Sequence, residues 1–135
     1  MYRSPDSVVA QFLEAMSTIL IKILQQYNKG VRIILAGDFN INVTANNRDS
    51  RDLLNTLLSF GLKHTITQAT RIQGSSASTI DNVFTNLHDF TSSVLAVGLS
   101  DHKGIQFNIK KQPLEQIILN REVSHNKIMR ISKTV

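Results

Sequence analysis

Apolar side chains recur every three or four residues between positions 9 and 27. They fall at Val9, Phe12, Leu13, Met16, Ile19, Leu20, Ile23, Leu24 and Tyr27. This spacing places them on one face and predicts an amphipathic helix. Ser4 or Ser7 is expected to cap its start, with Pro5 tolerated in the first turn, and residues 28–30 (NKG) supply the stop.

A short and almost continuously apolar run follows at residues 31–36 (VRIILA). Such a β-branched run predicts a central strand that is covered on both faces. The run ends at residues 37–40 (GDFN), and a polar stretch leads on to a second amphipathic helix. Asp49 or Ser50 is the expected N-cap of this helix, and Gly61 is its expected terminator.

The second half of the chain has the pattern of strands rather than of helices. Residues 68–78 are rich in Gly, Ser and Thr and have no period, which predicts a loop or a strand edge. Residues 79–85, 91–97 and 104–109 are strand candidates, and sequential antiparallel pairing is expected. Two helices with four or five strands indicate a layered α/β fold. The chain offers few partners for the apolar run at 31–36, so the sheet is expected to be incomplete.

Composition limits the classes of protein to which the chain can belong. With 135 residues, 41% hydrophobic and 19% charged, it has the balance of one globular domain. The absence of cysteine excludes disulfides, thiolate nucleophiles and sulfur-based zinc sites. No apolar run approaches the roughly eighteen residues of a membrane span, and the first ten residues lack a signal-peptide pattern. A soluble, unexported protein without membrane contact is expected.

The positive charge is concentrated at the end of the chain. The formal net charge is +5, and residues 110–135 hold six basic and two acidic residues, so they supply +4 of the total. We expect a folded part at residues 1–111 and a basic tail or linker at residues 112–135. Such a tail is consistent with attraction to nucleic acid, and equally with a solvated segment that has no partner.

Residues 37–40 place a carboxylate and a carboxamide two positions apart after a buried strand. In an extended backbone the side chains of Asp38 and Asn40 leave the same face. Asp38 is suited to bind a hard divalent cation or to hold an attacking water, and Asn40 to donate a hydrogen bond to a phosphate oxygen. The alternative is an ordinary turn, because Gly, Asp and Asn are common after strands.

Two further segments carry candidate acid/base residues. Residues 100–102 (SDH) place His102 between two strand candidates, where an imidazole can act as general acid or base. Asp81 lies within an otherwise apolar strand and needs a partner for its charge, and His102 is a natural one. The alternatives are a capped turn at 100–102 and an outward-facing edge position for Asp81.

The order of these motifs resembles the endonuclease/exonuclease/phosphatase superfamily, in its apurinic-endonuclease-like branch. The stretch 33–102, with QATR at 68–71 and TIDNVFTN at 79–86, is similar to the endonuclease domain of non-LTR (LINE-type) retrotransposons. The start YRSP at 2–5 resembles the family's Y-x-P segment. The resemblance implies the C-terminal half of a four-layer α/β sandwich, mainly antiparallel with flanking helices, and incomplete.

The resemblance also implies roles for individual residues. Asp38 would position or activate the attacking water, Asn40 would bind phosphate, and Asp81 with His102 would form a carboxylate–imidazole pair. Asp101 and Asp38 would build the site for Mg²⁺, with Mn²⁺ as an alternative. The implied reaction is in-line hydrolysis of a DNA phosphodiester.

Three more residues are candidates at the edge of this site. The resemblance implies that the phenol of Tyr2 lies near the leaving group or the phosphate. Arg71 is a candidate contact for backbone phosphate, and a solvated loop arginine is the alternative interpretation. Asn42 is a candidate DNA contact by its position in a polar loop.

One departure from the family pattern bears on activity. The first half of the family's domain provides an asparagine and a metal-binding glutamate, and Tyr2 already corresponds to a position midway through that domain. The isolated chain is therefore expected to be inactive, with DNA and the missing N-terminal half-domain or a reverse transcriptase domain as partners. The location implied is intracellular, and nuclear in an active retroelement. A non-catalytic binding fragment and a phosphatase or phosphoesterase remain as alternatives.

Overall fold

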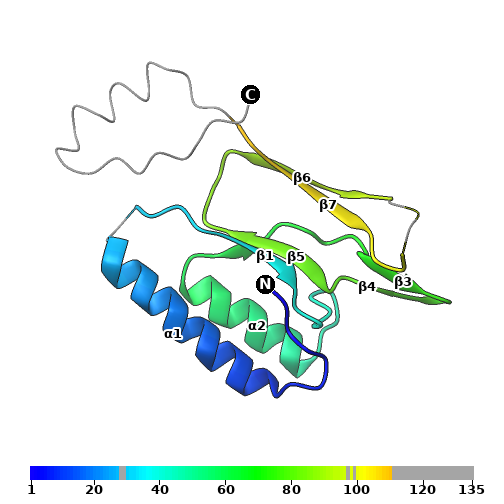
Figure 1. Ribbon diagram of the computed structural model, residues 1–135, viewed down its shortest axis with the longest axis horizontal. Coiled ribbons are helices and arrows are strands. Elements are labelled where there is room, and N and C mark those ends of the chain that lie inside the picture. Colours follow the sequence, from blue (N-terminus) through cyan, green and yellow to red (C-terminus); the bar gives the residue numbers. More distant parts are fainter. Residues whose placement is uncertain (28–29, 97, 99, 111–135) are drawn as a thin grey trace.

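The computed structural model describes residues 1–27, 30–96, 98 and 100–110 (Figure 1). The elements in these ranges are α1 (Val9–Tyr27), β1 (Ile34–Asp38), α2 (Arg48–Ser59), β2 (Lys63–His64), β3 (Arg71–Gln73), β4 (Ser76–Ser78), β5 (Asp81–Thr85), β6 (Phe90–Leu95) and β7 (Gly104–Ile109). One sheet has the order β1-β5-β2, and the pairs β3-β4 and β6-β7 form two smaller sheets. All these strand pairs are antiparallel. The predicted α/β class with mainly antiparallel strands is confirmed.

The core lies between the helices and the largest sheet. Both helices lie on one side of β1 and β5, and the β6-β7 hairpin lies on the other side (Figure 1). Phe39 and Phe84 are fully buried, and their ring centroids lie 5.0 Å apart in an edge-to-face arrangement. Leu53 and Leu57 of α2 are fully buried against the same cluster. Phe39, which directly follows Asp38, is therefore anchored in the core, and this fixes the end of β1.

The two predicted helices are present, and their start signals differ in part from the prediction. The helix α1 spans the predicted range, and residues 28–29 of its predicted stop lie outside the described residues. The N-cap of α2 is Asn47, whose side chain accepts a hydrogen bond from the Ser50 amide, so the predicted caps Asp49 and Ser50 lie two and three residues after the actual cap. Gly61 ends α2 with a φ of 76°, as predicted.

The prediction of a central strand at residues 31–36 was wrong in position and in burial. The strand β1 begins at Ile34 and is an edge strand, while β5 is central. The side chain of Asn86 accepts from the Ile33 amide and donates to the Val31 carbonyl, so it occupies backbone groups that a longer strand would use. Ile34 is 43% exposed. A continuous apolar run is compatible with a strand that is buried on both faces. It is equally compatible with a strand that is buried on one face and preceded by a buried non-strand segment.

The prediction of sequential pairing among the later strands is correct for one pair. The strands β6 and β7 pair with each other, whereas β5 pairs with β1 and β2, which are distant in the sequence. The Gly/Ser/Thr-rich stretch forms the β3-β4 hairpin, and Gly74 at its turn has a φ of 59°. The two-residue strand β2 was not predicted, because two residues are too short to show a period.

The end of the chain carries the remaining predictions about domain organisation. The predicted basic tail or linker at residues 112–135 lies outside the described residues. Among the residues that are described, no helix is long and apolar enough to cross a membrane.

Candidate active site

Strand pairing brings Asp38 and Asp81 to the same place. Asp38 is the last residue of β1, Asp81 is the first of β5, and the two are direct partners in the antiparallel register. Directly opposed residues project from the same face with their Cβ atoms about 5 Å apart. Two carboxylates at this separation repel each other, and a cation or an imidazolium beside them relieves the repulsion.

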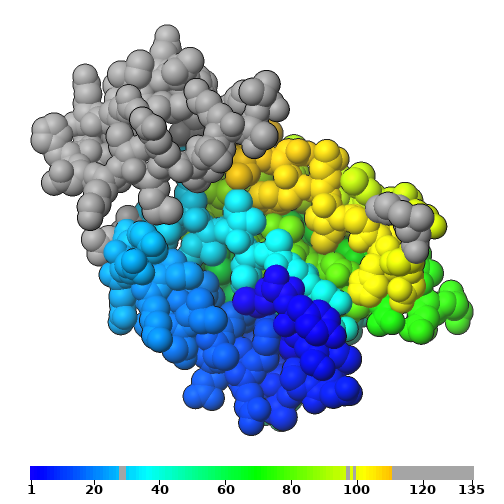
Figure 2. All heavy atoms as spheres, viewed as in Figure 1, coloured from blue at the N-terminus to red at the C-terminus, as the bar shows by residue number. Residues whose placement is uncertain are grey.

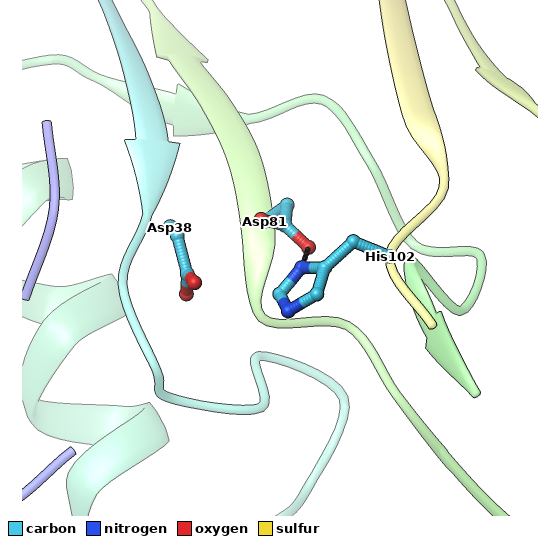
Figure 3. Close-up of side chains that lie close together, drawn as sticks. All are labelled: Asp38, Asp81 and His102. Carbon is cyan, nitrogen blue, oxygen red and sulfur yellow. Dashed lines mark hydrogen bonds and ion pairs between the residues drawn. The ribbon is translucent and has the colours of Figure 1, made fainter. Parts of the chain in front are cut away.

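His102 approaches this pair from the segment before β7. Its Nδ1 lies 3.0 Å from Oδ2 of Asp81, and both side chains are half-buried. The contact predicted from the sequence is therefore present. Ligand atoms of Asp38, Asp81 and His102 all lie within 4.8 Å of one another, and Figure 3 shows the three side chains converging from three segments of the chain. An ionised carboxylate only accepts, so Nδ1 is the donor in this pair.

Asn40 comes close to Asp38, although not by the route that the sequence suggested. An extended backbone was expected, but Asn40 has a φ of 48°, in the left-handed region, and its amide donates to Oδ1 of Asp38 at 2.9 Å. The turn directs the Asn40 side-chain amide to the carbonyl of Arg3 at 2.6 Å. The same-face prediction was wrong, because the strand ends at Asp38 and a turn replaces it.

Arg3 is a residue that sequence reasoning missed. It is 5% exposed, and its guanidinium donates to the carbonyls of Phe39 (2.7 Å) and Asn40 (3.0 Å). It also donates to the carbonyl and hydroxyl of Ser7, and the Ser7 hydroxyl itself donates to the Ser4 carbonyl. The two serines thus belong to the turn around Arg3. The guanidinium holds the turn after Asp38 by donating to its carbonyl groups, which also satisfies the buried donors of Arg3.

The N-terminal residues lie beside β1. Tyr2 forms a parallel bridge to Asp38, and the Asp38 amide donates to the carbonyl of Met1 at 3.0 Å. Figure 2 shows the N-terminal residues in dark blue against the cyan segment that contains β1. A Cβ at Gly37 would overlap the Met1 backbone, so this approach requires glycine. Tyr2 is 68% exposed.

Arg71 and Asp101, which were predicted for DNA and metal binding, contact each other. Nε of Arg71 donates to Oδ2 of Asp101 at 2.7 Å, with side-chain exposures of 33% and 40%. This hydrogen bond lowers the pKa of the Asp101 carboxyl below its usual value. Asp101 is not a member of the cluster formed by Asp38, Asp81 and His102. The roles predicted for these two residues stay predictions.

Asn42, the other predicted DNA contact, bonds its loop to the segment between β4 and β5. Its side-chain oxygen accepts from the Thr79 amide at 2.9 Å and from the Thr44 hydroxyl at 2.8 Å. These bonds secure the polar loop that follows the turn at Asn40. They leave the predicted contact with DNA as a prediction.

Two buried polar residues next to Asp81 were also missed by sequence reasoning. Thr70 is fully buried, and its hydroxyl accepts from the amides of Ile80 (3.2 Å) and Asp81 (3.0 Å). Asn82 is 1% exposed, and its side chain bonds to the backbone of Ile66 as both acceptor and donor. An asparagine within an apolar strand, such as Asn82 in β5, is a usable signal, because a buried polar group needs partners.

The donor set of the cluster fits a hard divalent cation in part. The carboxylates of Asp38 and Asp81 offer oxygen ligands, and Mg²⁺ is commonly held by one or two carboxylates together with water. The Nδ1 atom of His102 is engaged by Asp81, so the imidazole is better placed for proton transfer than for ligation.

Comparison with known proteins finds a matching family and similar solved structures. The sequence pattern of a family described as endonuclease-reverse transcriptase matches residues 1–106. No curated protein sequence matches the chain. The solved endonuclease domain of TRAS1, a telomere-specific non-LTR retrotransposon, is similar in structure, with a TM-score of 0.64 and 26% identity over 83% of this chain. The match covers 56% of the TRAS1 structure, so the chain spans little more than half of that domain.

A second solved structure supports the fold. An endonuclease/exonuclease/phosphatase family protein from Leptotrichia buccalis C-1013-b has a TM-score of 0.52 and 24% identity, with 71% of this chain and 42% of that chain covered. At this identity the similarity concerns the fold alone.

Proposed function

Because the chain belongs to the endonuclease-reverse transcriptase family of the endonuclease/exonuclease/phosphatase superfamily, we propose that it carries the second half of an active site for hydrolysis of DNA phosphodiester bonds. The observation that carries the proposal is the convergence of Asp38, Asp81 and His102. The similarity to the TRAS1 endonuclease domain supports DNA as the substrate and nicking as the reaction.

In this proposal, Asp81 and His102 act as one unit. Asp81 accepts a hydrogen bond from Nδ1 of His102 and so orients the ring. Nε2 is then directed away from Asp81 (Figure 3). An imidazole held in this way can exchange a proton at Nε2 with a group of the substrate. Asp38, opposite Asp81 in the register, holds the attacking water by accepting a hydrogen bond from it.

The proposed metal is Mg²⁺, with Mn²⁺ as an alternative of similar ligand preference. Asp38 is the ligand common to the prediction and to the observed cluster, and the Asp81 carboxylate completes a pair of oxygen donors. A bound divalent cation neutralises charge on the phosphate. Asp101 is proposed as a further contributor, from its place next to His102.

Substrate contacts are proposed for the groups around the cluster. Asn40, held next to Asp38, is the proposed phosphate-binding residue, and the exposed Tyr2 phenol is proposed to lie against the leaving group. Arg71 and Asn42 are proposed at the edge of the nucleic-acid surface. Charged and amide side chains of this kind make most phosphate contacts in protein–DNA complexes.

The 135-residue chain is proposed to be inactive by itself. The matched part covers 56% of the TRAS1 domain. The proposed partners are an N-terminal half-domain and a reverse transcriptase domain, in a nuclear retroelement protein. Residues 1–111 would form the domain and residues 112–135 a basic linker.

The proposal is tested by nicking of supercoiled plasmid in the presence of Mg²⁺. The chain is assayed alone and fused behind the part of the TRAS1 endonuclease domain that it does not cover, each with and without Asp38→Ala. The fusion is expected to nick, and Asp38→Ala is expected to reduce the rate by at least about 10²-fold, because it removes the proposed water-holding and metal-binding group.

The control is Lys22→Ala, which removes an exposed charge from α1. Nicking by the chain alone that Asp38→Ala abolishes would overturn the inactivity proposal. A folded fusion that leaves plasmid intact would overturn the endonuclease proposal.

A further inference from the structure

The residues at the start of β3 contact both partners of the Asp81–His102 pair. On one side, the buried Thr70 hydroxyl accepts from the Asp81 amide at 3.0 Å and from the Ile80 amide at 3.2 Å. One hydroxyl thus fixes the backbone at the point where the Asp81 side chain leaves β5. Because two N–H groups share this acceptor and the residue is fully buried, the position of Asp81 relative to Thr70 is well determined.

On the other side, the same segment holds the backbone around His102. The Ile72 amide donates to the Asp101 carbonyl at 2.9 Å, and the Lys103 amide donates to the Thr70 carbonyl at 2.6 Å. Between these two bonds, Arg71 and His102 form an antiparallel bridge. Residues 101–103 therefore pair with β3 although they belong to no named strand, and this pairing sets how far His102 lies from Asp81.

A side-chain contact reinforces this bridge. Nε of Arg71 donates to Oδ2 of Asp101 at 2.7 Å. Arg71 is the bridge partner of His102, and Asp101 is the residue directly before His102. A charge-assisted bond of this length is short and directional. Exposed ion pairs add little to global stability, so the main effect of this one is on local geometry.

From this geometry we propose that Arg71 is a positioning residue, which acts through Asp101 to hold His102 against Asp81. The proposal rests on the proposed function, in which His102 exchanges a proton. When Arg71 holds Asp101, the imidazole stays within hydrogen-bond distance of Asp81, with Nδ1 as donor and Nε2 open to the substrate. Without this contact the segment at 100–103 shifts, and a shift of about 1 Å is enough to misplace a catalytic group. This role differs from that of a phosphate contact, which would leave the Asp81–His102 pair intact.

The test uses ring-nitrogen NMR signals of His102 in the 135-residue chain, and it needs no nuclease activity. In its neutral form, the ring bonded to Asp81 carries its proton on Nδ1, whereas a free ring favours Nε2. Arg71→Ala is expected to shift the His102 signals towards those of Asp81→Asn, which removes the charged acceptor. It is also expected to speed amide exchange at Ile72 and Lys103 roughly fivefold.

A double-mutant cycle identifies the route of the effect. Asp101→Ala should give the same ring signals as Arg71→Ala, and the double variant should add nothing, since both changes break one contact. Arg71→Lys, which keeps the charge but not the directed guanidinium, should lie between wild type and Arg71→Ala. Lys22→Ala on α1 should leave the ring signals unchanged.

Unchanged ring signals in Arg71→Ala, with amide protection in β5 retained, would refute the positioning role and favour a phosphate contact. If Arg71→Ala does not fold, Asp101→Ala decides alone, because it removes the acceptor of the same hydrogen bond. A failure of the nicking experiment would leave these signals unaffected, so the two proposals fail independently.

Discussion

At the scale of single residues, the candidate site consists of polar groups held by specific partners. The Asp38 carboxylate accepts from the Asn40 amide, and the Asp81 carboxylate contacts His102. The candidate residues Asp38, Asp81 and His102 were evident in the sequence, because charged groups at the ends of apolar strands stand out. Arg3 was not evident, since a basic residue near a chain end gives no sign that it is buried.

A residue-scale prediction concerns His64 on β2, which is half-buried beside Phe84. Burial lowers the pKa of this imidazole below its usual value. Because the folded chain then takes up the proton less readily than the unfolded chain, the contribution of His64 is fully present above about pH 6.5 and is lost as the pH falls through its folded pKa.

We expect the free energy of unfolding in urea to fall between pH 8 and pH 5, and to fall less in His64→Gln. The control is Lys63→Gln, which alters the neighbouring residue of β2 without removing a group that titrates in this range. Equal slopes for His64→Gln and wild type would show that His64 does not contribute.

At the scale of elements, the end of β1 depends on its two neighbours. Register with β5 places Asp38 opposite Asp81, and residues 1–3 pair along the other edge. The sequence predicted that a strand precedes Asp38, but not that it is an edge strand. Apolar content within a strand does not report the order of strands in a sheet, because that order depends on segments far away in the chain.

An element-scale prediction follows for Gly37, where a Cβ would overlap the Met1 backbone. Gly37→Ala should detach residues 1–3 from β1 or move β1 away from them. Overpacking of this kind typically costs about 1–3 kcal/mol of stability. The Asp38 amide, which donates to the Met1 carbonyl, should lose protection from hydrogen exchange.

The matched control for this change is Gly98→Ala, since a Cβ at Gly98 meets nothing within 4 Å. Hydrogen exchange at Asp38 should be unchanged in that variant. Protection of Asp38 that survives Gly37→Ala would mean that the N-terminal segment adapts without leaving β1.

At the scale of the whole molecule, the described residues have one main core and a peripheral hairpin. The core cluster comprises residues of α1, α2, β5 and the segments around β1, and it contains no residue of β6 or β7. The hairpin is held instead by its own ladder, by a stacked contact between Phe90 and Phe107, and by the bond from the Ser92 hydroxyl to the Thr65 carbonyl. His102 lies just before β7, so mobility of the hairpin bears directly on the site.

We therefore predict that the β6-β7 hairpin opens before the core does. In native-state hydrogen exchange, protected amides of β6 should exchange at least about tenfold faster than those of Val83 and Phe84 in β5, because sub-global opening involves the elements with the least buried apolar contact. Identical exchange in both elements under the same denaturant would indicate a single cooperative unit.

The sequence by itself determined the two helices, the presence of a strand before Asp38, and the residues that make up the candidate site. Helical faces, turn residues and polar groups at strand ends are local features, so a linear pattern contains them. Tertiary structure alone decided that β5 is central, that Asp38 opposes Asp81, and that Arg71 engages Asp101. These contacts join positions about 20 to 50 residues apart, and their formation depends on which strands pair, which no local pattern specifies.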